Sequence, residues 1–319
     1  MALIASRLNR VLCAWVLLVA GCGVAPRLPA PADSAGRLRV VATTTLVADL
    51  VRSVGGGRVT VQALMGPGVD PHLYKPSIGD VIRLDEADAV FYNGLHLEGR
   101  MADLFENMRR VGKHTYAIAS AVPPDALLVK EDGMPDPHIW FDPELWGMAA
   151  RGVADALSRL DPEGTDIYQR RLAAYLADLA QLDEWTRSEL ARIPPQARRL
   201  VTAHDAFGYF GARYGLEVRA LQGINTAAEV GTRDVQQLAS FLAEQRVPAI
   251  FVETSVSAAT LEAVRQATLA QGWEVRFGDV LFSDALGAPA SAADTHAGMV
   301  MHNVNAIVAA LSSTPDPAP

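Results

Sequence analysis

The stretch that decides the fold is DPEGTDIYQRRLAAYLADLAQLDEWTRSELARIPP, residues 161–195, which carries only helical signals. It opens with a capping residue and a first-turn proline, Asp161 and Pro162, and it closes at Pro194. Its apolar residues recur at steps of three and four, with one gap near Thr186. They are Tyr168, Leu172, Tyr175, Leu176, Leu179, Leu182, Leu190 and Ile193. A helix of about thirty residues rises about 45 Å, so we expect one stiff helix over residues 161–193 that links two folded parts.

On both sides of this stretch, short β-rich apolar runs alternate with helical patterns, as in proteins with parallel sheets. The expected strands span residues 38–43, 59–64, 89–92 and 115–118 before it, and 200–202, 217–221, 249–252 and 274–275 after it. The clearest expected helices span residues 46–54, 78–86, 207–214, 230–245 and 257–271. We therefore predict an α/β fold of two similar lobes, residues 37–160 and 194–319, each with a parallel sheet flanked by helices.

The first residues have the pattern of an export signal. Two arginines precede an apolar run over residues 11–20, and small residues stand immediately before Cys22. The run is about ten residues long, whereas a spanning helix needs about twenty, so a transmembrane anchor is the weaker interpretation. The other alternative is an ordinary leader with an incidental cysteine. We predict that residues 1–21 are a signal peptide, that Cys22 carries a lipid, and that residues 22–36 form a flexible tether.

Cysteine content and charge restrict the possible functions. The only other cysteine, Cys13, lies in the predicted leader, so the mature protein would have no internal disulfide and must be held by its core. With 319 residues, of which 50% are hydrophobic, the chain is long enough for such a core. The formal net charge is -8, or about -10 without the two arginines of the leader, which argues against a nucleic-acid partner.

Four turns that should follow strands carry residues from which a metal site could be built. They are Asp70-Pro71-His72, Asp136-Pro137-His138, Thr202-Ala203-His204-Asp205 and Phe282-Ser283-Asp284. Ligand sites in parallel sheets lie beyond the carboxyl ends of the strands, so these turns should meet between the lobes. Imidazole nitrogen and carboxylate oxygen suit zinc, with manganese also possible. Four protein donors would fill a tetrahedral shell and leave no position for water, so the site would hold metal rather than catalyse a reaction with it. The candidate ligands are His72, His138, His204 and Asp284.

Several other residues compete with these ligands or surround them. Asp279 lies near Asp284 in the sequence and is its rival. Asp70 and Asp136 each precede Pro-His and are interpreted as turn formers or as acceptors that orient a ligand. Three aromatic residues are expected to pack around the site: Trp140, Phe141 and Trp146. The other histidines are assigned no metal role: His96, His114, His296 and His302.

Six motifs stand in a distinctive order and spacing over residues 38–312. They are Asp70-Pro71-His72-Leu73-Tyr74, Asn93-Gly94-Leu95, Asp136-Pro137-His138-Ile139-Trp140, Thr202-Ala203-His204-Asp205-Ala206-Phe207-Gly208-Tyr209, Val252-Glu253-Thr254-Ser255-Val256-Ser257 and Leu281-Phe282-Ser283-Asp284. Together they resemble the TroA-type zinc and manganese receptors of ABC importers. The resemblance implies two α/β lobes joined by one long helix, with a metal site in the cleft between them.

The same resemblance implies a role for each candidate ligand and for the whole chain. Position by position, the implied ligands are His72, His138, His204 and Asp284. The implied function is an extracytoplasmic receptor that delivers a divalent metal ion to an ABC transporter permease and its ATPase. We expect a monomer, anchored to the membrane by its lipid and facing the periplasm or the cell exterior.

Two departures from the family bear on the choice of metal. Zinc-specific members often carry a long loop rich in histidine and acidic residues before the second ligand, and residues 122–137 contain no histidine. Many manganese members have glutamate at the third ligand position, where this chain has His204. Because three imidazoles and one carboxylate favour zinc over the harder manganese ion, we expect zinc, with manganese as the alternative.

Two other functions could use the same residues. A zinc hydrolase would need an open coordination position and a general base, for which Glu253 is the only nearby candidate. A metal-binding surface adhesin lipoprotein is a role that some relatives have been assigned. We expect a metal receptor rather than either of these, and no enzyme activity.

Overall fold

The computed structural model describes residues 36–130 and 133–312. The predicted signal peptide, Cys22 and nearly all of the predicted tether lie outside the described residues. Among the helices that are described, none is both long enough and apolar enough to cross a membrane.

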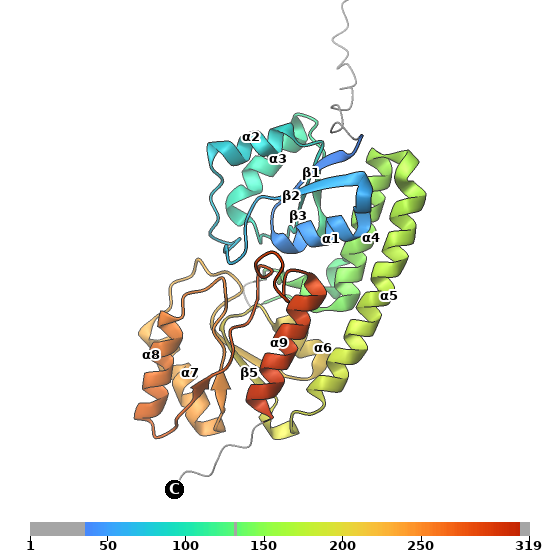
Figure 1. The fold of residues 1–319 in the computed structure, drawn as a ribbon. Coiled ribbons are helices and arrows are strands. Elements are labelled where there is room, and N and C mark those ends of the chain that lie inside the picture. Colours follow the sequence, from blue (N-terminus) through green and yellow to red (C-terminus); the bar gives the residue numbers. More distant parts are fainter. Residues whose placement is uncertain (1–35, 131–132, 313–319) are drawn as a thin grey trace, which may run out of the picture. The chain divides into compact units, whose positions relative to one another are not determined.

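The first lobe, residues 38–160, is built on a parallel sheet with the strand order β2-β1-β3-β4 (Figure 1). Its strands are β1 (Leu38–Ala42), β2 (Val59–Ala63), β3 (Ala89–Tyr92) and β4 (Thr115–Ala117). β1 is an inner strand, because Val40 is in register with Val61 on one side and with Ala89 on the other. Consecutive residues at the end of β1 are buried, which is typical of a strand covered on both faces.

Four helices belong to this lobe. They are α1 (Thr45–Gly55), α2 (Ile78–Glu86), α3 (Ala102–Arg110) and α4 (Pro143–Leu160). α1 begins where the hydroxyl of Thr44 accepts a hydrogen bond from the amide of Val47, and α2 begins with a capping box between Ser77 and Asp80. These two helices agree with the expected ones to within one residue, whereas α3 and α4 are additions to them.

α5 (Thr165–Leu190) is the long helix that links the lobes, and its 26 residues make it shorter than the predicted 161–193. The difference at its start has a physical cause. Asp161 does not cap α5, because its carboxylate accepts hydrogen bonds from Arg58, at 2.5 Å and 2.7 Å, and from the hydroxyl of Tyr168, at 2.6 Å. A short 3-10 turn precedes the helix instead.

The second lobe, residues 199–312, contains two parallel strand pairs. Its strands are β5 (Arg199–His204), β6 (Glu217–Gln222), β7 (Ala249–Ile250) and β8 (Arg276–Phe277). A parallel bridge between Thr202 and Phe251 joins the β5–β6 pair to β7. A second parallel bridge, between Glu253 and Leu281, continues the pairing of β7 and β8. The second lobe therefore also has its strands in parallel.

One predicted strand of this lobe is displaced. The strand expected at residues 274–275 begins at Arg276, whose amide donates to the carbonyl of Pro248 at 3.1 Å. Both residues of β8 are exposed, so this strand lacks the apolar run that marks the others. The helices of the lobe are α6 (Gly208–Tyr214), α7 (Thr232–Gln245), α8 (Ala259–Ala270) and α9 (His296–Leu311). The first three agree with the expected helices to within two residues, and α9 is an addition.

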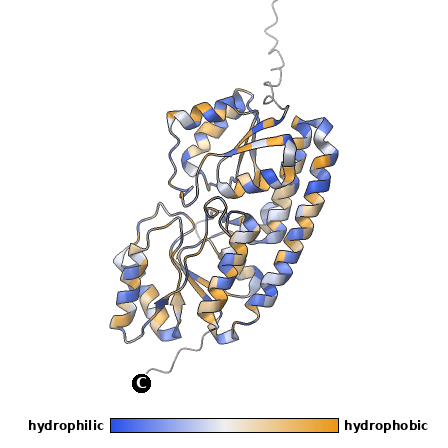
Figure 2. Ribbon diagram, in the orientation of Figure 1, coloured by the Kyte–Doolittle hydropathy of each residue, from blue (hydrophilic) through white to orange (hydrophobic). Residues whose placement is uncertain are grey.

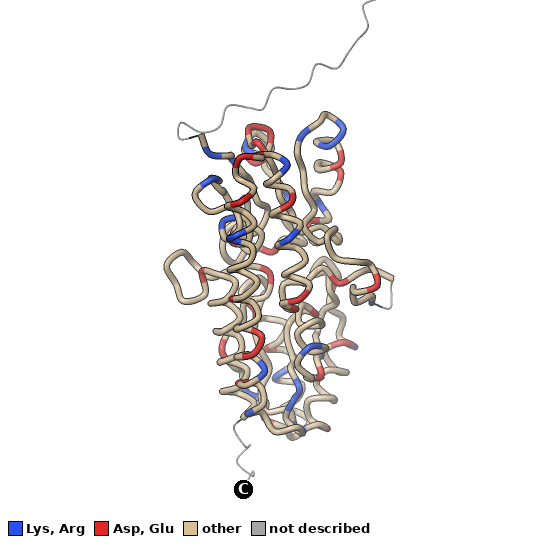
Figure 3. Tube along the Cα trace, turned by 90° about the vertical axis from the view of Figure 1, so that its right-hand side faces the viewer, with Lys and Arg blue, Asp and Glu red and all other residues tan. Residues whose placement is uncertain are grey.

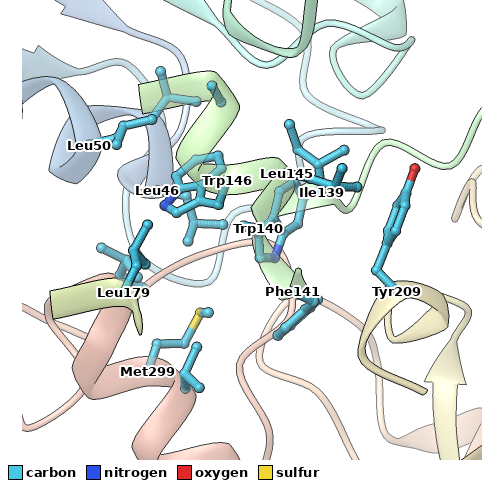
Figure 4. Packing of buried hydrophobic residues seen from close by; sticks show 14 of the residues in the cluster. Leu46, Leu50, Ile139, Trp140, Phe141, Leu145, Trp146, Leu179, Tyr209 and Met299 are labelled. Carbon is cyan, nitrogen blue, oxygen red and sulfur yellow. The ribbon is translucent and has the colours of Figure 1, made fainter. Parts of the chain in front are cut away.

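One hydrophobic core connects the two lobes. α9 packs against α5 and α1, and Figure 4 shows Leu46, Leu179 and Met299 of these helices gathered near Trp146. The indole of Trp146 donates a hydrogen bond to the hydroxyl of Tyr175 at 2.9 Å. In Figure 2 each long helix carries both hydrophobic and hydrophilic residues, as expected when one face is buried. The shared core keeps the second lobe attached to the helices of the first.

Charged residues of both signs are interspersed on the side of the molecule shown in Figure 3. A group of ion pairs lies near the C-terminal end of α5. Arg213 of α6 donates to the carboxylate of Asp183 at 2.9 Å and 2.7 Å, and Arg187 lies 3.4 Å from the same carboxylate. Mixed charge of this kind produces no strong field of one sign.

Candidate metal centre

The structure brings the four candidate ligands together between the lobes. One donor atom from each lies within 4.8 Å of the others: His72, His138, His204 and Asp284. All four side chains are buried. The centroids of the three imidazole rings lie 5.3 Å, 5.5 Å and 5.9 Å apart. A single ion could therefore contact all four side chains at once.

Two of these residues come from identical tripeptides, Asp-Pro-His, in the first lobe. In each tripeptide, the aspartate accepts a hydrogen bond from the amide of the histidine that follows. The amide of His72 lies 2.8 Å from Oδ1 of Asp70, and the amide of His138 lies 3.0 Å from Oδ1 of Asp136. The prediction that these aspartates are turn formers or acceptors is confirmed for the backbone amides of both histidines, and Asp136 alone also lies against the ring of its histidine.

The other two residues leave the ends of strands in the second lobe. His204 is the last residue of β5, and Asp284 follows the bridge at Leu281. The amide of His204 donates to Oε1 of Glu253 at 2.9 Å, and the hydroxyl of Ser255 donates to Oδ2 of Asp284 at 3.0 Å. The site thus lies where ligand sites of parallel sheets are expected, beyond the carboxyl ends of the strands.

Carboxylates orient two of the three imidazoles. Oδ1 of Asp136 is hydrogen-bonded to Nδ1 of His138 at 2.6 Å, and Oε2 of Glu253 lies 2.5 Å from Nδ1 of His204, an ion-pair distance at which the two atoms do not meet hydrogen-bond geometry. With a proton held on Nδ1, each ring presents the lone pair of Nε2 to the centre of the cluster. These two Nε2 atoms lie 3.5 Å and 3.3 Å from the carboxylate oxygens of Asp284.

The imidazole of His72 has no such partner. No hydrogen bond joins its ring to another part of the chain that the structure describes, and its Nε2 is buried. The same lack of a hydrogen-bond partner, within the described residues, holds for Nε2 of His138 and His204 and for Oδ1 of Asp284. A buried polar atom without a partner costs about 1–3 kcal/mol, and a cation at the centre would satisfy all four. The donor set therefore fits a divalent metal ion.

The charges in the cluster also favour a cation. Burial lowers the pKa of His72 to about 3, so its ring stays neutral and keeps its lone pair. Burial opposes protonation of His138 and His204 as well, but nearby carboxylates raise the pKa of both rings above the ordinary value. Burial acts to raise the pKa of Asp284, but the surrounding histidines hold that pKa well below its usual range. The carboxylate is therefore ionised, and a bound cation would replace protons on the rings.

The competing candidates lie elsewhere. Asp279, the rival fourth ligand, is exposed and is not part of the cluster. His96 and His114 are exposed too. His296 and His302 each use Nε2 in a hydrogen bond to a backbone carbonyl, at 2.8 Å and 2.9 Å. None of these five side chains is placed to reach the same ion.

Trp140 is the aromatic residue that packs directly on the site. Its ring meets His138 edge to face, with the centroids 5.2 Å apart, and its indole donates to the carbonyl of Ser283 at 2.9 Å. Phe141 and Trp146 pack in the surrounding core (Figure 4). Trp140 therefore links a histidine turn of the first lobe to the segment that carries the aspartate in the second.

Three residues support the site without having been assigned this role from the sequence. Glu253, considered above as a general base, orients a ring of the cluster instead. Thr226 donates from its hydroxyl to Oδ2 of Asp70 at 2.6 Å, and Asn93 donates from Nδ2 to the carbonyl of Pro137 at 3.0 Å. Each acts on a residue distant in sequence, so no local pattern could have revealed the contact.

Comparison with known proteins agrees with this arrangement. Residues 40–310 match the family described as ZnuA, zinc-uptake complex component A, periplasmic, and the chain belongs to this family. The manganese-binding lipoprotein MntA of Bacillus subtilis (strain 168) is 43% identical over 297 residues, which cover 91% of this chain and 94% of MntA. The zinc-binding protein TroA of Treponema pallidum (strain Nichols) is also 43% identical, over 277 residues, which cover 87% of this chain and 90% of TroA.

A solved structure extends the comparison to the fold. The periplasmic zinc binding protein TroA from Treponema pallidum superposes with a TM-score of 0.84 over 86% of this chain and 99% of that one. A more distant relative, the manganese ABC transporter substrate-binding lipoprotein PsaA of Streptococcus mitis, is 30% identical over 289 residues, which cover 88% of this chain and 91% of PsaA. The predicted α/β fold with parallel sheets and one long helix is confirmed, and so is the resemblance to TroA-type receptors.

Proposed function

We propose that this protein binds one divalent metal ion as its substrate and delivers it to the permease of an ABC importer, which works with its own ATPase. The observation that carries the proposal is the set of four buried donor atoms without hydrogen-bond partners in the described chain. They come from both lobes: Nε2 of His72, His138 and His204, and Oδ1 of Asp284. The relative named as an ABC transporter substrate-binding lipoprotein supports the transport role.

Zinc is the ion that we propose for this site. Three imidazole nitrogens and one carboxylate form a shell of borderline donors, and zinc lies above manganese in intrinsic affinity for such ligands. The names of the relatives do not decide the matter, because one relative at 43% identity is called zinc-binding and another is called manganese-binding. Manganese is therefore the alternative ion.

Export and membrane anchoring complete the proposal. Residues 1–21 would direct export, Cys22 would carry the lipid, and residues 22–36 would tether a monomer. Its two lobes, residues 37–160 and 194–319, lie on either side of the segment that contains α5 (Thr165–Leu190). The relatives called lipoproteins support an anchor. Mass spectrometry of the Cys22→Ser variant should find no lipid, while its metal affinity stays unchanged. Lipid on that variant would contradict the proposed anchor.

The arrangement supports a receptor rather than a hydrolase. Glu253 lies against Nδ1 of His204 on the side away from Nε2, so it is engaged in orienting a ligand. Four protein donors also fill the tetrahedral shell that zinc prefers, which leaves no position for a reacting water. We therefore propose no catalytic activity.

The ligand set is tested by titrating metal-free protein with zinc against a chelator of known affinity. We expect one ion per chain, and a loss of affinity of at least about tenfold when any one ligand is changed to alanine, because the vacated position is filled only by water. His96→Ala and Asp279→Ala serve as controls and should bind as the wild type does. If Asp279→Ala abolishes binding while Asp284→Ala does not, the fourth ligand is misassigned.

Competition between zinc and manganese at neutral pH tests the choice of metal. The wild-type chain should retain zinc from an equimolar mixture, and His204→Glu should narrow the preference, because a carboxylate hardens the site and can supply a second oxygen. Loading of manganese by the wild type would overturn the zinc assignment and leave the receptor function in place.

A further inference from the structure

We infer that Thr226 is a positioning residue for metal binding, which holds His72 in place from the opposite lobe through Asp70. The inference rests on the proposed function and adds to it the contact that controls how long the ion is retained. It starts from the difference between the three histidines: His138 and His204 each have a carboxylate oxygen, at 2.6 Å and 2.5 Å, beside Nδ1, whereas the ring of His72 makes neither an ion pair nor a hydrogen bond within the described chain.

Asp70 is the residue through which Thr226 would act. Its Oδ1 accepts a hydrogen bond from the amide of His72 at 2.8 Å, and its Oδ2 accepts one from the hydroxyl of Thr226 at 2.6 Å. A carboxylate that bridges two donors in this way has little freedom to rotate, because each charge-assisted hydrogen bond fixes one oxygen. The position of the His72 main chain is thus tied to a side chain of the second lobe.

The segment that carries Thr226 is shaped for this contact. It follows β6 and precedes α7, and within it Thr226 is only 8% exposed while Asn225 and Ala227 on either side are exposed. Nε2 of Gln222 donates to the carbonyls of Thr226 and Ala228, at 3.4 Å and 3.1 Å, and Asn225 accepts from the amide of Ala227 at 2.9 Å. These hydrogen bonds hold the turn, so its one buried hydroxyl is presented at a fixed place.

The two lobes also come close together at a second place, next to the hydrogen bond between Asp70 and Thr226. Gly68, two residues before Asp70, has φ +71°, and a Cβ atom added there would lie 3.5 Å from the carbonyl oxygen of Thr254. The turn that carries His72 is therefore met from the second lobe at two places. Of the two, only the Thr226 contact is a hydrogen bond to a side chain that itself binds the histidine segment.

The consequence concerns the rate at which metal leaves. The two histidines with carboxylate partners keep their orientation whether or not the Thr226 contact is made. His72 loses its indirect support when that hydrogen bond breaks, so it should be the first ligand to move away from the ion. Loss of the Thr226 hydroxyl should therefore speed dissociation and change association little.

The test compares Thr226→Val, which removes the hydroxyl at nearly constant shape, with Thr226→Ser, which keeps it. Zinc dissociation is measured by stopped flow with excess chelator, and association is measured in parallel. Thr226→Val should speed dissociation about tenfold, as expected for one lost charge-assisted hydrogen bond. Thr226→Ser should restore the wild-type rate. The matched control is Thr186→Val in α5, because the Thr186 hydroxyl is buried without a hydrogen-bond partner in the described chain; its dissociation rate should not change.

A double-mutant cycle separates positioning of His72 from a general structural effect. In the His72→Ala background, Thr226→Val should have no further effect on dissociation, since the residue through which it acts is gone. An equal effect in both backgrounds, or an unchanged rate in Thr226→Val alone, would overturn the inference. If thermal unfolding of the metal-free protein shows that Thr226→Val is poorly folded, Thr226→Ala is used in its place, and the same increase in the dissociation rate is expected. Failure of the wild type to bind zinc or manganese would instead overturn the proposed function itself.

Discussion

The two Asp-Pro-His tripeptides of the first lobe share a sequence and a backbone hydrogen bond, but they have different surroundings. Asp136 uses one oxygen for both the amide and the ring of its histidine, at 3.0 Å and 2.6 Å. Asp70 serves only the amide of its histidine and turns its other oxygen to Thr226 of the second lobe. The motif therefore sets the turn, while tertiary partners decide what else the carboxylate does.

The difference changes the chemistry of the two imidazoles. Burial lowers the pKa of His72 to about 3. Burial also opposes protonation of His138, yet Asp136 beside its ring raises the pKa of His138 above the ordinary value. His138 is thus a more basic donor held within its own lobe, and His72 is a weaker base whose place depends on the second lobe. Equal sequence motifs therefore do not imply equal surroundings for the two imidazoles.

The largest expected effect on zinc affinity comes from neutralising Asp136, and the same change at Asp70 is its comparison. Asp136→Asn removes the charge beside the ring of His138 and should weaken zinc binding about tenfold to 100-fold, the usual range for the loss of a carboxylate behind a metal-bound histidine. Asp70→Asn should weaken it by less than about threefold, because an amide can still accept from His72 and can donate to the hydroxyl of Thr226. Chelator competition at neutral pH measures both.

The two variants are controls for each other, since each replaces the first residue of the same tripeptide. Equal losses in Asp136→Asn and Asp70→Asn would show that the aspartates act only through the turn. A greater loss in Asp70→Asn would reverse the proposed order of the two ligands.

Much of the fold could be predicted from local patterns. α2 has a capping box at its start, and its observed bounds are the predicted ones. The start of α5 could not be predicted, because Asp161 has the pattern of a capping residue and is instead bound by Arg58. β8 could not be predicted either, because both of its residues are exposed and leave no apolar run.

In the candidate site, too, some residues could be predicted from local sequence patterns and others could not. The four residues that the structure brings together could be chosen from the sequence, because each stands in a short turn motif with a donor suited to metal, even though β2 and β4 end well before His72 and His138. The residues that orient them could not. Glu253 lies 49 positions from His204, and Thr226 lies 156 positions from Asp70. Hydrogen bonds over such separations follow from the folded arrangement and leave no periodic signal.

A second prediction extends the comparison to His296, another buried histidine without a carboxylate at its ring. Burial lowers the pKa of His296 to about 4, against a hydrogen bond to the carbonyl of Trp140. In the unfolded chain the pKa of this residue has its ordinary value of about 6.5. Between that pH and the folded-state pKa of about 4, the unfolded chain binds a proton at His296 and the folded protein does not. This residue therefore makes the folded state less stable as the pH falls through that range.

His296→Gln tests this effect, because glutamine can keep the hydrogen bond to the carbonyl of Trp140 and cannot be protonated. Urea unfolding of metal-free protein between pH 7 and pH 4.5 should show a shallower loss of stability in the variant, by about 2 kcal/mol over the range. Parallel pH profiles for the wild type and the variant would contradict a lowered pKa at His296.

The smallest expected effect comes from a glycine that lies against only one of the two tripeptides. Gly208 begins α6, and a Cβ atom added there would lie 2.8 Å from Oδ2 of Asp136 and 3.2 Å from Nζ of Lys130. The buried carboxylate cannot turn away without disturbing its hydrogen bond to His138. Gly208→Ala should therefore weaken zinc binding about threefold, less than loss of the carboxylate itself.

The matched control for this variant is Gly79→Ala, which lies in the first turn of α2 on the His72 side. A Cβ atom there meets only the hydroxyl of Ser77, at an ordinary 3.6 Å. Gly79→Ala should favour the helix by up to about 1 kcal/mol relative to glycine, whereas the close approach to Asp136 works against that gain in Gly208→Ala. A difference in the stability of the metal-free protein therefore does not identify an effect on the site. Zinc affinity should distinguish the two variants, because only Gly208→Ala displaces the Asp136 carboxylate, which is hydrogen-bonded to the ring of His138. If the two variants bind zinc equally well, the Asp136 carboxylate has more freedom than its burial indicates, and the contrast between the two tripeptides is smaller than proposed.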